Sequence, residues 1–458
     1  MRLKDEAMTA SEFYGLRDQR TALEITEDAR LTASLLIGIS DEEAQTVAGQ
    51  AAFLLLVNLS SRWCRTICIY GPDIQLFEPL ASMHPGSNLL EAAILCARHC
   101  DPFGDFQISQ STSQITAHVH VGRDAPEGAY PICGRGWLAL TGENARSGGC
   151  PVQPDNALGA ILAGSIGAWH AFSLALGRQA GANVHVSLWN LDEDNEATQG
   201  PEVLGGTVGR VGLIGVGAIG GAIAYLLPVT RIDADLILVD RDVADFPNLN
   251  RVPLFYADDV FSKLLKVEIV HKFLTRCSIS SQPVEAWFHE ADSHLGALDL
   301  LIAGANEHNV QPAIMNRFPP IIIGASTGPD WDAFLQRHIP LKEDCLECRL
   351  PTKQTAAPTE CATGVFDEPT AQTALAETGA LPFLSVAAGV MAVSELQKLA
   401  ACPDYPLNSN YAVLSFKSSQ PTLLATQFSQ KAGCSYCWKP EPAFHALHKQ
   451  SRHYHLST

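Results

Sequence analysis

The sequence predicts an α/β protein whose C-terminal half holds a Rossmann-like, doubly wound sheet. An apolar run at residues 210–216, RVGLIGV, ends at glycines and is followed by a helix-forming segment at 218–228 and a buried strand at 235–240. This order is typical of a βαβ unit in a parallel sheet. Two more apolar runs, at 298–304 and 320–326, have room for a helix between them and extend the sheet.

The N-terminal half repeats this plan in a weaker form. Strands are predicted at 31–40 and 66–71 with a helix at 42–59 between them, and the apolar segment 157–177 resembles the buried helix predicted at 383–400. The glycine loop is missing from this copy. Two interpretations stay open: a degenerate, nucleotide-free copy that pairs with the C-terminal domain as a pseudo-dimer, or an unrelated α/β domain.

Chain length predicts two domains, because 458 residues exceed what one hydrophobic core usually supports. The segment 189–206 is polar, acidic and contains Gly and Pro, as a linker does. We therefore expect domains at 1–204 and 205–458. In the second domain, an irregular stretch is expected at 330–382, with late strands at 411–417 and 421–428.

Composition and charge narrow the classes of partner. A net charge of −18 without a long basic run argues against nucleic acid. Thirteen cysteines and an N-terminus without an apolar signal core indicate a reducing cytoplasm. The uncharged stretches 157–177 and 211–230 have the length of a membrane span, but their glycines favour buried elements of an α/β protein, so no membrane partner is expected.

The glycine loop GVGAIGG suggests a phosphate-binding turn. Gly215, Gly217 and Gly220 lie between a strand and a helix, where backbone amides can approach a phosphate. Asp240 ends the next strand, where a carboxylate binds ribose hydroxyls. Taken alone, these features favour an NAD-dependent dehydrogenase.

The residues after Asp240 change this interpretation. Asp242, Arg251 and Lys266 add an acid and two cations that a dinucleotide site does not need. Asp242 offers a hard oxygen ligand for magnesium, while Arg251 and Lys266 can neutralise phosphate charge during acyl-phosphoryl transfer. The cluster therefore predicts a site for ATP and Mg²⁺.

Cysteines and histidines form two further patterns. The pairs Cys345/Cys348 and Cys434/Cys437 are two CxxC motifs, which predict a structural zinc site with four cysteine ligands that fastens the end of the chain to the domain. His118 and His120 lie on one face of a predicted strand, but we find no third ligand near them in the sequence and expect a structural role.

With these motifs, residues 205–438 resemble the ThiF/MoeB-type adenylyltransferases and the adenylation domains of ubiquitin-activating enzymes. The shared run is a glycine loop, a DxD strand end, NLNR at 248–251 and a lysine before a helix. The resemblance implies that Asp240 holds the ribose, Asp242 the magnesium, and Asn248, Arg251 and Lys266 the phosphates. Where relatives place a second magnesium-binding aspartate, this chain has Asn306, whose amide oxygen is a neutral ligand.

The resemblance also implies residues outside the nucleotide pocket. Cys361 follows the first CxxC pair where relatives carry a cysteine, and it is the expected nucleophile for a thioester. Relatives form dimers or pseudo-dimers in which an N-terminal arginine of one half reaches the ATP of the other. Arg17 and Arg20 are the candidates here, in either a pseudo-dimeric monomer or a homodimer.

The preferred hypothesis is an enzyme that adenylates the C-terminal glycine of a ubiquitin-like protein and then forms a thioester, with a conjugating enzyme as a further partner. One alternative is a sulfur-carrier or small-molecule adenylyltransferase of the ThiF/MoeB type. Another is a non-catalytic nucleotide-binding scaffold, which the replacement at Asn306 permits. An NAD oxidoreductase is the least favoured.

Overall fold

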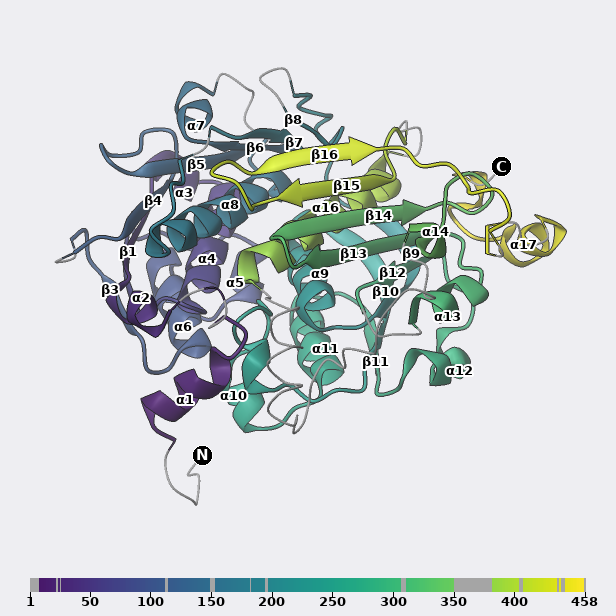
Figure 1. The fold of residues 1–458 in the computed structure, drawn as a ribbon, viewed down its shortest axis with the longest axis horizontal. Coiled ribbons are helices and arrows are strands. Elements are labelled where there is room, and N and C mark those ends of the chain that lie inside the picture. The colour runs from purple at the N-terminus through teal and green to yellow at the C-terminus, as the bar shows by residue number, and fades with distance from the viewer. Residues whose placement is uncertain are drawn as a thin grey trace.

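The computed structural model describes residues 8–21, 24, 26–111, 114–148, 153–181, 183–193, 197–305, 310–349, 381–402, 407–434, 436–437 and 441–456. Within these ranges the chain forms two eight-stranded sheets with helices packed on them, one in each half of the molecule (Figure 1). The predicted α/β class with a Rossmann-like sheet in the C-terminal half is confirmed.

The first sheet consists of β1 (Ser34–Ile39), β2 (Thr66–Tyr70), β3 (Asp105–Ile108), β4 (Ala117–Val121), β5 (Tyr130–Arg135), β6 (Leu138–Thr141), β7 (His185–Ser187) and β8 (Asp192–Glu193). The second consists of β9 (Gly206–Ile214), β10 (Ile232–Val239), β11 (Ser281–Val284), β12 (Leu300–Ala303), β13 (Ile322–Gly328), β14 (Asp332–His338), β15 (Tyr411–Ser415) and β16 (Thr422–Thr426).

The two sheets share one topology. The strand orders are β3-β2-β1-β4-β5-β6-β7-β8 and β11-β10-β9-β12-β13-β14-β15-β16. In each order the first five strands are parallel and the remaining pairings are antiparallel. The winding direction reverses beside β1 and beside β9, which makes each sheet doubly wound. The N-terminal half therefore repeats the C-terminal fold strand by strand.

Helices of the N-terminal half are α1 (Ala10–Arg17), α2 (Glu27–Thr32), α3 (Asp41–Ala44), α4 (Val47–Ser61), α5 (Leu80–Met83), α6 (Leu89–Cys100), α7 (Glu143–Ser147) and α8 (Leu158–Ala175). Those of the C-terminal half are α9 (Ala218–Thr230), α10 (Ala257–Phe261), α11 (Lys266–Arg276), α12 (Asp292–Leu295), α13 (Val310–Asn316), α14 (Leu346–Arg349), α16 (Pro382–Ala401) and α17 (Glu441–His448).

Two local predictions need correction. The helix expected at 42–59 is two helices, because the Thr46 side chain caps α4 by accepting a hydrogen bond from the amide of Gly49 at 2.9 Å. The stretch expected to be irregular from 330 to 382 contains β14, which pairs with β13, and the short helix α14. The domain boundary predicted near 204 falls in the connection between β8 and β9 and stays a prediction.

The halves share one hydrophobic core, built around α8 and α16. These helices pack against each other, α4 packs on α8, and α9 packs on α16. Phe172 of α8 and Phe383 of α16 lie with ring centroids 5.8 Å apart, and the Trp169 indole donates to the carbonyl of Phe416 at 3.0 Å. Folding of either half therefore buries apolar surface of the other.

Two helices in the described part of the chain, α8 and α16, are long and apolar enough to cross a membrane by length and composition alone. Their apolar windows are 89% and 94% buried inside the protein. The sequence predicted such burial for 157–177, and it predicted the same for 211–230, which forms the end of β9, the glycine turn and α9.

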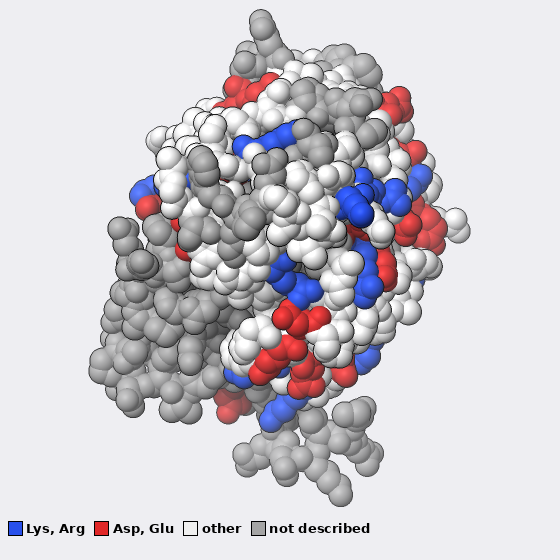
Figure 2. Space-filling model, turned by 90° about the vertical axis from the view of Figure 1, so that its right-hand side faces the viewer, with Lys and Arg blue, Asp and Glu red and all other residues white. Residues whose placement is uncertain are grey.

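Figure 2 shows the side of the molecule where α12, α13 and α17 lie. Lys and Arg side chains stand there in small groups, several of them beside Asp and Glu, with uncharged residues between the groups. Over the described residues of this face, charges of both signs are therefore mixed.

Candidate nucleotide and zinc sites

The glycine loop joins β9 to α9 at the point where the second sheet reverses its winding direction. Gly215 has φ +79°, a conformation that side chains other than that of Gly rarely allow. A Cβ at Gly220 would lie 1.9 Å from the carbonyl oxygen of Gly215, so this glycine lets the helix approach the turn. A Cβ at Gly217, the N-cap of α9, would meet no atom within 4 Å. The open backbone at the helix N-terminus suits an anion.

Asp240 follows β10 and faces this loop. Its carboxylate accepts hydrogen bonds from the amide of Val216 and the amide of Asp242, both at 2.9 Å. Burial raises the pKa of this carboxyl, while the nearby charge of Lys266 lowers it. The two amides fix the carboxylate beside the glycine loop, where the sequence predicted that it binds ribose.

Lys266 and Asp242 form a largely buried ion pair in the same region. The Lys266 ammonium lies 2.6 Å from Oδ2 of Asp242, and the two side chains are 7% and 16% exposed. The pair forms because residues 242–244 run antiparallel to 264–266, with the amide of Lys266 donating to the carbonyl of Asp242 at 2.9 Å. Metal and phosphate binding by these groups stays a prediction.

The NLNR segment forms a tight turn next to these acids. The amide of Asp245 donates to Oδ1 of Asn248 at 3.0 Å, which closes the short helix Phe246–Asn248. Arg251 is buried, and its guanidinium donates to the carbonyl of Pro247 at 2.6 Å. These contacts make the turn compact and keep both predicted phosphate ligands on one loop.

The two N-terminal arginine candidates lie in different environments. Arg17 is fully buried and pairs with Asp18 and Asp101, each at 2.7 Å, inside the N-terminal half. Arg20 is half-buried and precedes Thr21, whose hydroxyl accepts a hydrogen bond from Asn250 at 2.8 Å. Arg17 is therefore held by ion pairs within the N-terminal half. The segment that contains Arg20, in contrast, lies against the NLNR turn.

Two predicted residues lie outside the described part of the chain. Cys361, the expected nucleophile, falls in 350–380, and Asn306, the neutral replacement for a magnesium-binding aspartate, falls in 306–309. The roles of both residues stay predictions from the sequence.

Other groups around the site were not singled out by sequence reasoning. The Arg241 guanidinium lies 3.6 Å from the centroid of the Trp287 ring, beside Asp240. Arg62 of the N-terminal half reaches the carbonyl of Leu249 at 2.6 Å, although 187 residues separate the two positions. In the sequence, Arg62 is distinguished only by its position, as a lone arginine directly after the uncharged segment 47–61.

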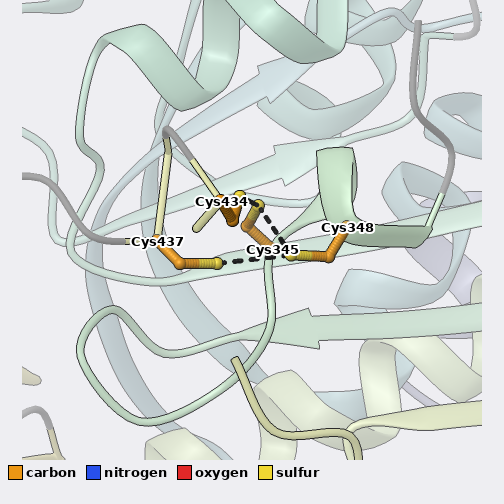
Figure 3. A group of neighbouring side chains, drawn as sticks. All are labelled: Cys345, Cys348, Cys434 and Cys437. Carbon is orange, nitrogen blue, oxygen red and sulfur yellow. Dashed lines mark hydrogen bonds between the residues drawn. The ribbon is translucent and has the colours of Figure 1, made fainter. Parts of the chain in front are cut away.

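The four predicted zinc ligands come together in the structure (Figure 3). Cys345 and Cys348 lie at α14, and Cys434 and Cys437 come from the segment after β16. The four sulfurs lie within 4.8 Å of one another, and neighbouring sulfurs are 3.5 to 3.8 Å apart. A tetrahedral zinc with bonds of about 2.3 Å requires sulfur separations of about 3.8 Å. The donor set and its spacing therefore fit zinc.

The pKa shifts within this cysteine cluster go in both directions, because the pKa of Cys345 is lowered while those of Cys348 and Cys437 are raised. The hydrogen bond with Cys437 is the main reason that the pKa of Cys345 is lowered to about 6. A thiol that ionises near neutral pH is ready to bind a cation. Among the described residues, these four cysteines are the one group of His, Cys, Asp or Glu that could hold a metal ion.

Comparison with protein families matches both halves. The model of the ThiF family matches residues 206–436, just over half of the chain. The model described as the BilD N-terminal domain matches residues 34–191. No curated protein sequence matches the chain.

Solved structures with some similarity include several of MccB from E. coli. MccB in complex with ATP is 20% identical, with a TM-score of 0.39, over 50% of this chain and 65% of MccB. A complex of MccB with MccA-N7isoASN is 21% identical, with a TM-score of 0.39, over 50% of this chain and 66% of MccB. A structure titled only MccB is 19% identical, with a TM-score of 0.40, over 67% of this chain and 94% of MccB.

In the first two of these comparisons the chain spans just under two thirds of MccB. Such values do not transfer an activity, a substrate or a partner. The family match stands independently of them, because it covers the glycine loop, the acids after β10, the first CxxC motif and Cys434 of the second. The chain belongs to the ThiF family.

Proposed function

We propose that this protein is an ATP-dependent adenylyltransferase that activates the C-terminal glycine of a ubiquitin-like protein and then holds it as a thioester on Cys361. The arrangement that carries the proposal is the Lys266–Asp242 pair next to Asp240 and the glycine loop, in a ThiF-family domain. It brings the predicted ligands of ribose, metal and phosphate together at one edge of the sheet, which supports the proposal.

In the first step, a carboxylate oxygen of the substrate attacks the α-phosphorus of ATP, and pyrophosphate leaves with the electron pair of the broken P–O bond. Asp240 holds the ribose, and the amides at the N-terminus of α9 face the phosphates. Arg251 and Lys266 neutralise the charge that develops on the phosphate oxygens. Magnesium bound at Asp242 would supply further neutralisation of the pyrophosphate.

In the second step, the thiolate of Cys361 attacks the carbonyl carbon of the acyl-adenylate. AMP leaves with the electron pair of the broken C–O bond, the thiol proton passes to solvent, and a thioester remains. A conjugating enzyme of the reducing cytoplasm would be the next acceptor.

The N-terminal half of the molecule supports a protein substrate. It repeats the adenylation fold, and its match to a BilD N-terminal domain sets it apart from the ThiF match. A sulfur-carrier or small-molecule enzyme of the ThiF/MoeB type does not need such a copy. A non-catalytic scaffold would bind ATP and release no pyrophosphate.

Intact-protein mass spectrometry tests the proposal. The enzyme is mixed with ATP, Mg²⁺ and ubiquitin-fold proteins that end in glycine, with Cys361→Ala as the control. We expect an adduct equal to the modifier minus water, sensitive to thiols and missing in the variant. An adduct that survives in Cys361→Ala would place the thioester elsewhere. If no modifier supports ATP–pyrophosphate exchange, the proposal fails.

A further inference from the structure

A buried arginine of the N-terminal half contacts residues 249–255 of the other half, a loop that begins within the NLNR segment. Arg62 is the C-cap residue of α4 and is completely buried. Its guanidinium donates to three carbonyl oxygens of residues 249–255: Leu249 at 2.6 Å, Pro253 at 2.9 Å and Phe255 at 3.2 Å. One side chain thus holds both ends of this loop.

Asn58, one helical turn earlier, completes the arrangement. Its Oδ1 accepts from Nε of Arg62 at 2.8 Å, and its Nδ2 donates to the carbonyl of Pro253 at 3.1 Å. The ion pairs found within the described ranges do not include Arg62. Desolvating a cation costs free energy, so a buried guanidinium needs hydrogen-bond acceptors. Arg62 finds them in neutral carbonyl oxygens of this loop, and the same hydrogen bonds hold the loop in place.

The loop that Arg62 holds carries a predicted phosphate ligand. In the chain, Arg251 lies between Leu249 and Pro253, whose carbonyls bind Arg62, and it directly follows Asn250. The next residue, Val252, packs on α9: its Cγ1 would lie 2.7 Å from a Cβ placed at Gly221. A shift of the loop would therefore move Arg251 relative to the glycine turn.

We propose that Arg62 is a positioning residue, through which the N-terminal half fixes the loop that presents Arg251 to ATP. The role in ATP binding rests on the proposed function, whereas the role in loop order does not. The N-terminal half thus acts as a built-in partner of the nucleotide site. Its contribution is preorganisation of the loop, because Arg62 is too deeply buried to touch a ligand.

The test uses the full chain with Arg62→Gln, Arg62→Lys and the double variant Glu43→Gln/Arg135→Gln. The double variant is the matched control, because it removes another buried arginine of the N-terminal half, paired with Glu43 at 2.6 Å in β5 and α3. Hydrogen exchange of residues 248–256 without ligand and calorimetric ATP affinity with Mg²⁺ are measured where each variant is folded.

We expect exchange in 248–256 to accelerate about tenfold or more in Arg62→Gln, and ATP affinity to fall about tenfold. Arg62→Lys, which cannot bridge three carbonyls, should show a smaller effect of the same kind, and the control should show neither. Equal exchange in Arg62→Gln and the control would overturn the inference. If the wild-type protein binds no ATP, the proposed function fails, while the exchange data still decide whether Arg62 orders the loop.

Discussion

The two halves of this molecule share a strand order but treat the turn after the first strand differently. Gly49 is the third residue of α4, as Gly220 is the third residue of α9, and a Cβ at Gly49 would lie 2.1 Å from the carbonyl oxygen of Glu43. Both halves thus keep the glycine that lets the helix approach the turn. The glycines that are predicted to form an open phosphate site, Gly215 and Gly217, occur only in the C-terminal half.

In the N-terminal half, charged side chains occupy the corresponding turn. β1 continues into Ser40 and the acidic helix α3, whose Glu43 is 4% exposed and bonded to Arg135. Burial raises the pKa of the Glu43 carboxyl, and the Arg135 charge opposes this shift. A carboxylate at this place repels phosphate and its space is taken, so we do not expect nucleotide here.

The C-terminal ends of β10 and β2 also carry different side chains. Asp240 follows β10, whereas β2 ends in Tyr70, whose hydroxyl lies 2.8 Å from Nε2 of His118 and 2.9 Å from Nδ1 of His120. The HVH pair of the sequence thus contacts a tyrosine side chain. Contacts that support the fold are thus present in both halves, while the predicted ligand-binding groups are concentrated in one.

The largest expected effect concerns the cysteine cluster of the C-terminal half. We predict one zinc per chain by elemental analysis, and Cys345→Ser should abolish binding and lower the free energy of unfolding by several kcal/mol. The physical reason is that the ion would join α14 to the segment after β16, which carry the four cysteines. Cys133→Ser, a change at a buried cysteine of the N-terminal half, is the control and should keep the zinc. A zinc-free wild-type protein of unchanged stability would contradict this prediction.

Loss of the Lys266 ammonium should have the next largest effect. Lys266→Ala leaves Asp242 unpaired and removes a phosphate ligand, so we expect pyrophosphate exchange to fall about 100-fold or more. Exchange is measured at saturating ATP, with thermal unfolding as a check of folding. Lys417→Ala, which removes an exposed ion pair with Asp330, should leave the rate unchanged. Equal rates in all three proteins would show that Lys266 is not part of the site.

Gly220 and Gly49 occupy corresponding positions in the two halves, so variants of them distinguish effects on stability from effects on ATP binding. Gly220→Ala and Gly49→Ala each force a Cβ against a backbone carbonyl, so both should lower the unfolding free energy by about 1–3 kcal/mol. At a temperature where both variants are folded, only Gly220→Ala should weaken ATP binding. The measurement is ATP titration beside thermal denaturation. Comparable losses of affinity in both variants would mean that the N-terminal turn also shapes the nucleotide site.

The smallest expected effect is a change in acid sensitivity of the N-terminal half. Burial lowers the pKa of His170 to about 4, and its ring stacks on Tyr130 with centroids 3.8 Å apart. The unfolded chain, with an ordinary histidine pKa near 6.5, binds the proton more readily, so stability falls as pH drops from about 6.5 to 4.

His170→Phe keeps an aromatic ring and removes this proton uptake. The decrease in melting temperature between pH 7 and pH 5 should therefore be roughly 2 °C smaller than in the wild type. Thermal scans at both pH values measure it. A variant with the wild-type slope would show that His170 does not titrate on unfolding.

Local patterns predicted the C-terminal half well. The glycine loop, the strand at 235–240 and the two CxxC motifs each depend on spacing over a few residues, and the structure brings each set together. The repeat in the N-terminal half was also visible, because its long apolar helix 157–177 has the same character as α16.

Features built from distant residues could not be predicted. β7 and β8 have three and two residues, too few for a periodic pattern, and they exist because they extend a sheet that is already formed. Arg17 was predicted from the resemblance as a candidate for reaching ATP, and its buried pairing with Asp101 could not be foreseen because that partner is 84 positions away. The contact of Arg62 with residues 249–255 likewise depends on packing between distant parts of the chain.

ATP-binding stoichiometry tests the contrast between the halves most directly. Calorimetric titration of the full chain with ATP and Mg²⁺ should give one site per chain, and Asp240→Ala should eliminate it, because that carboxylate is fixed by two amides beside the glycine loop. Two sites per chain, or a single site that survives in Asp240→Ala, would contradict the account.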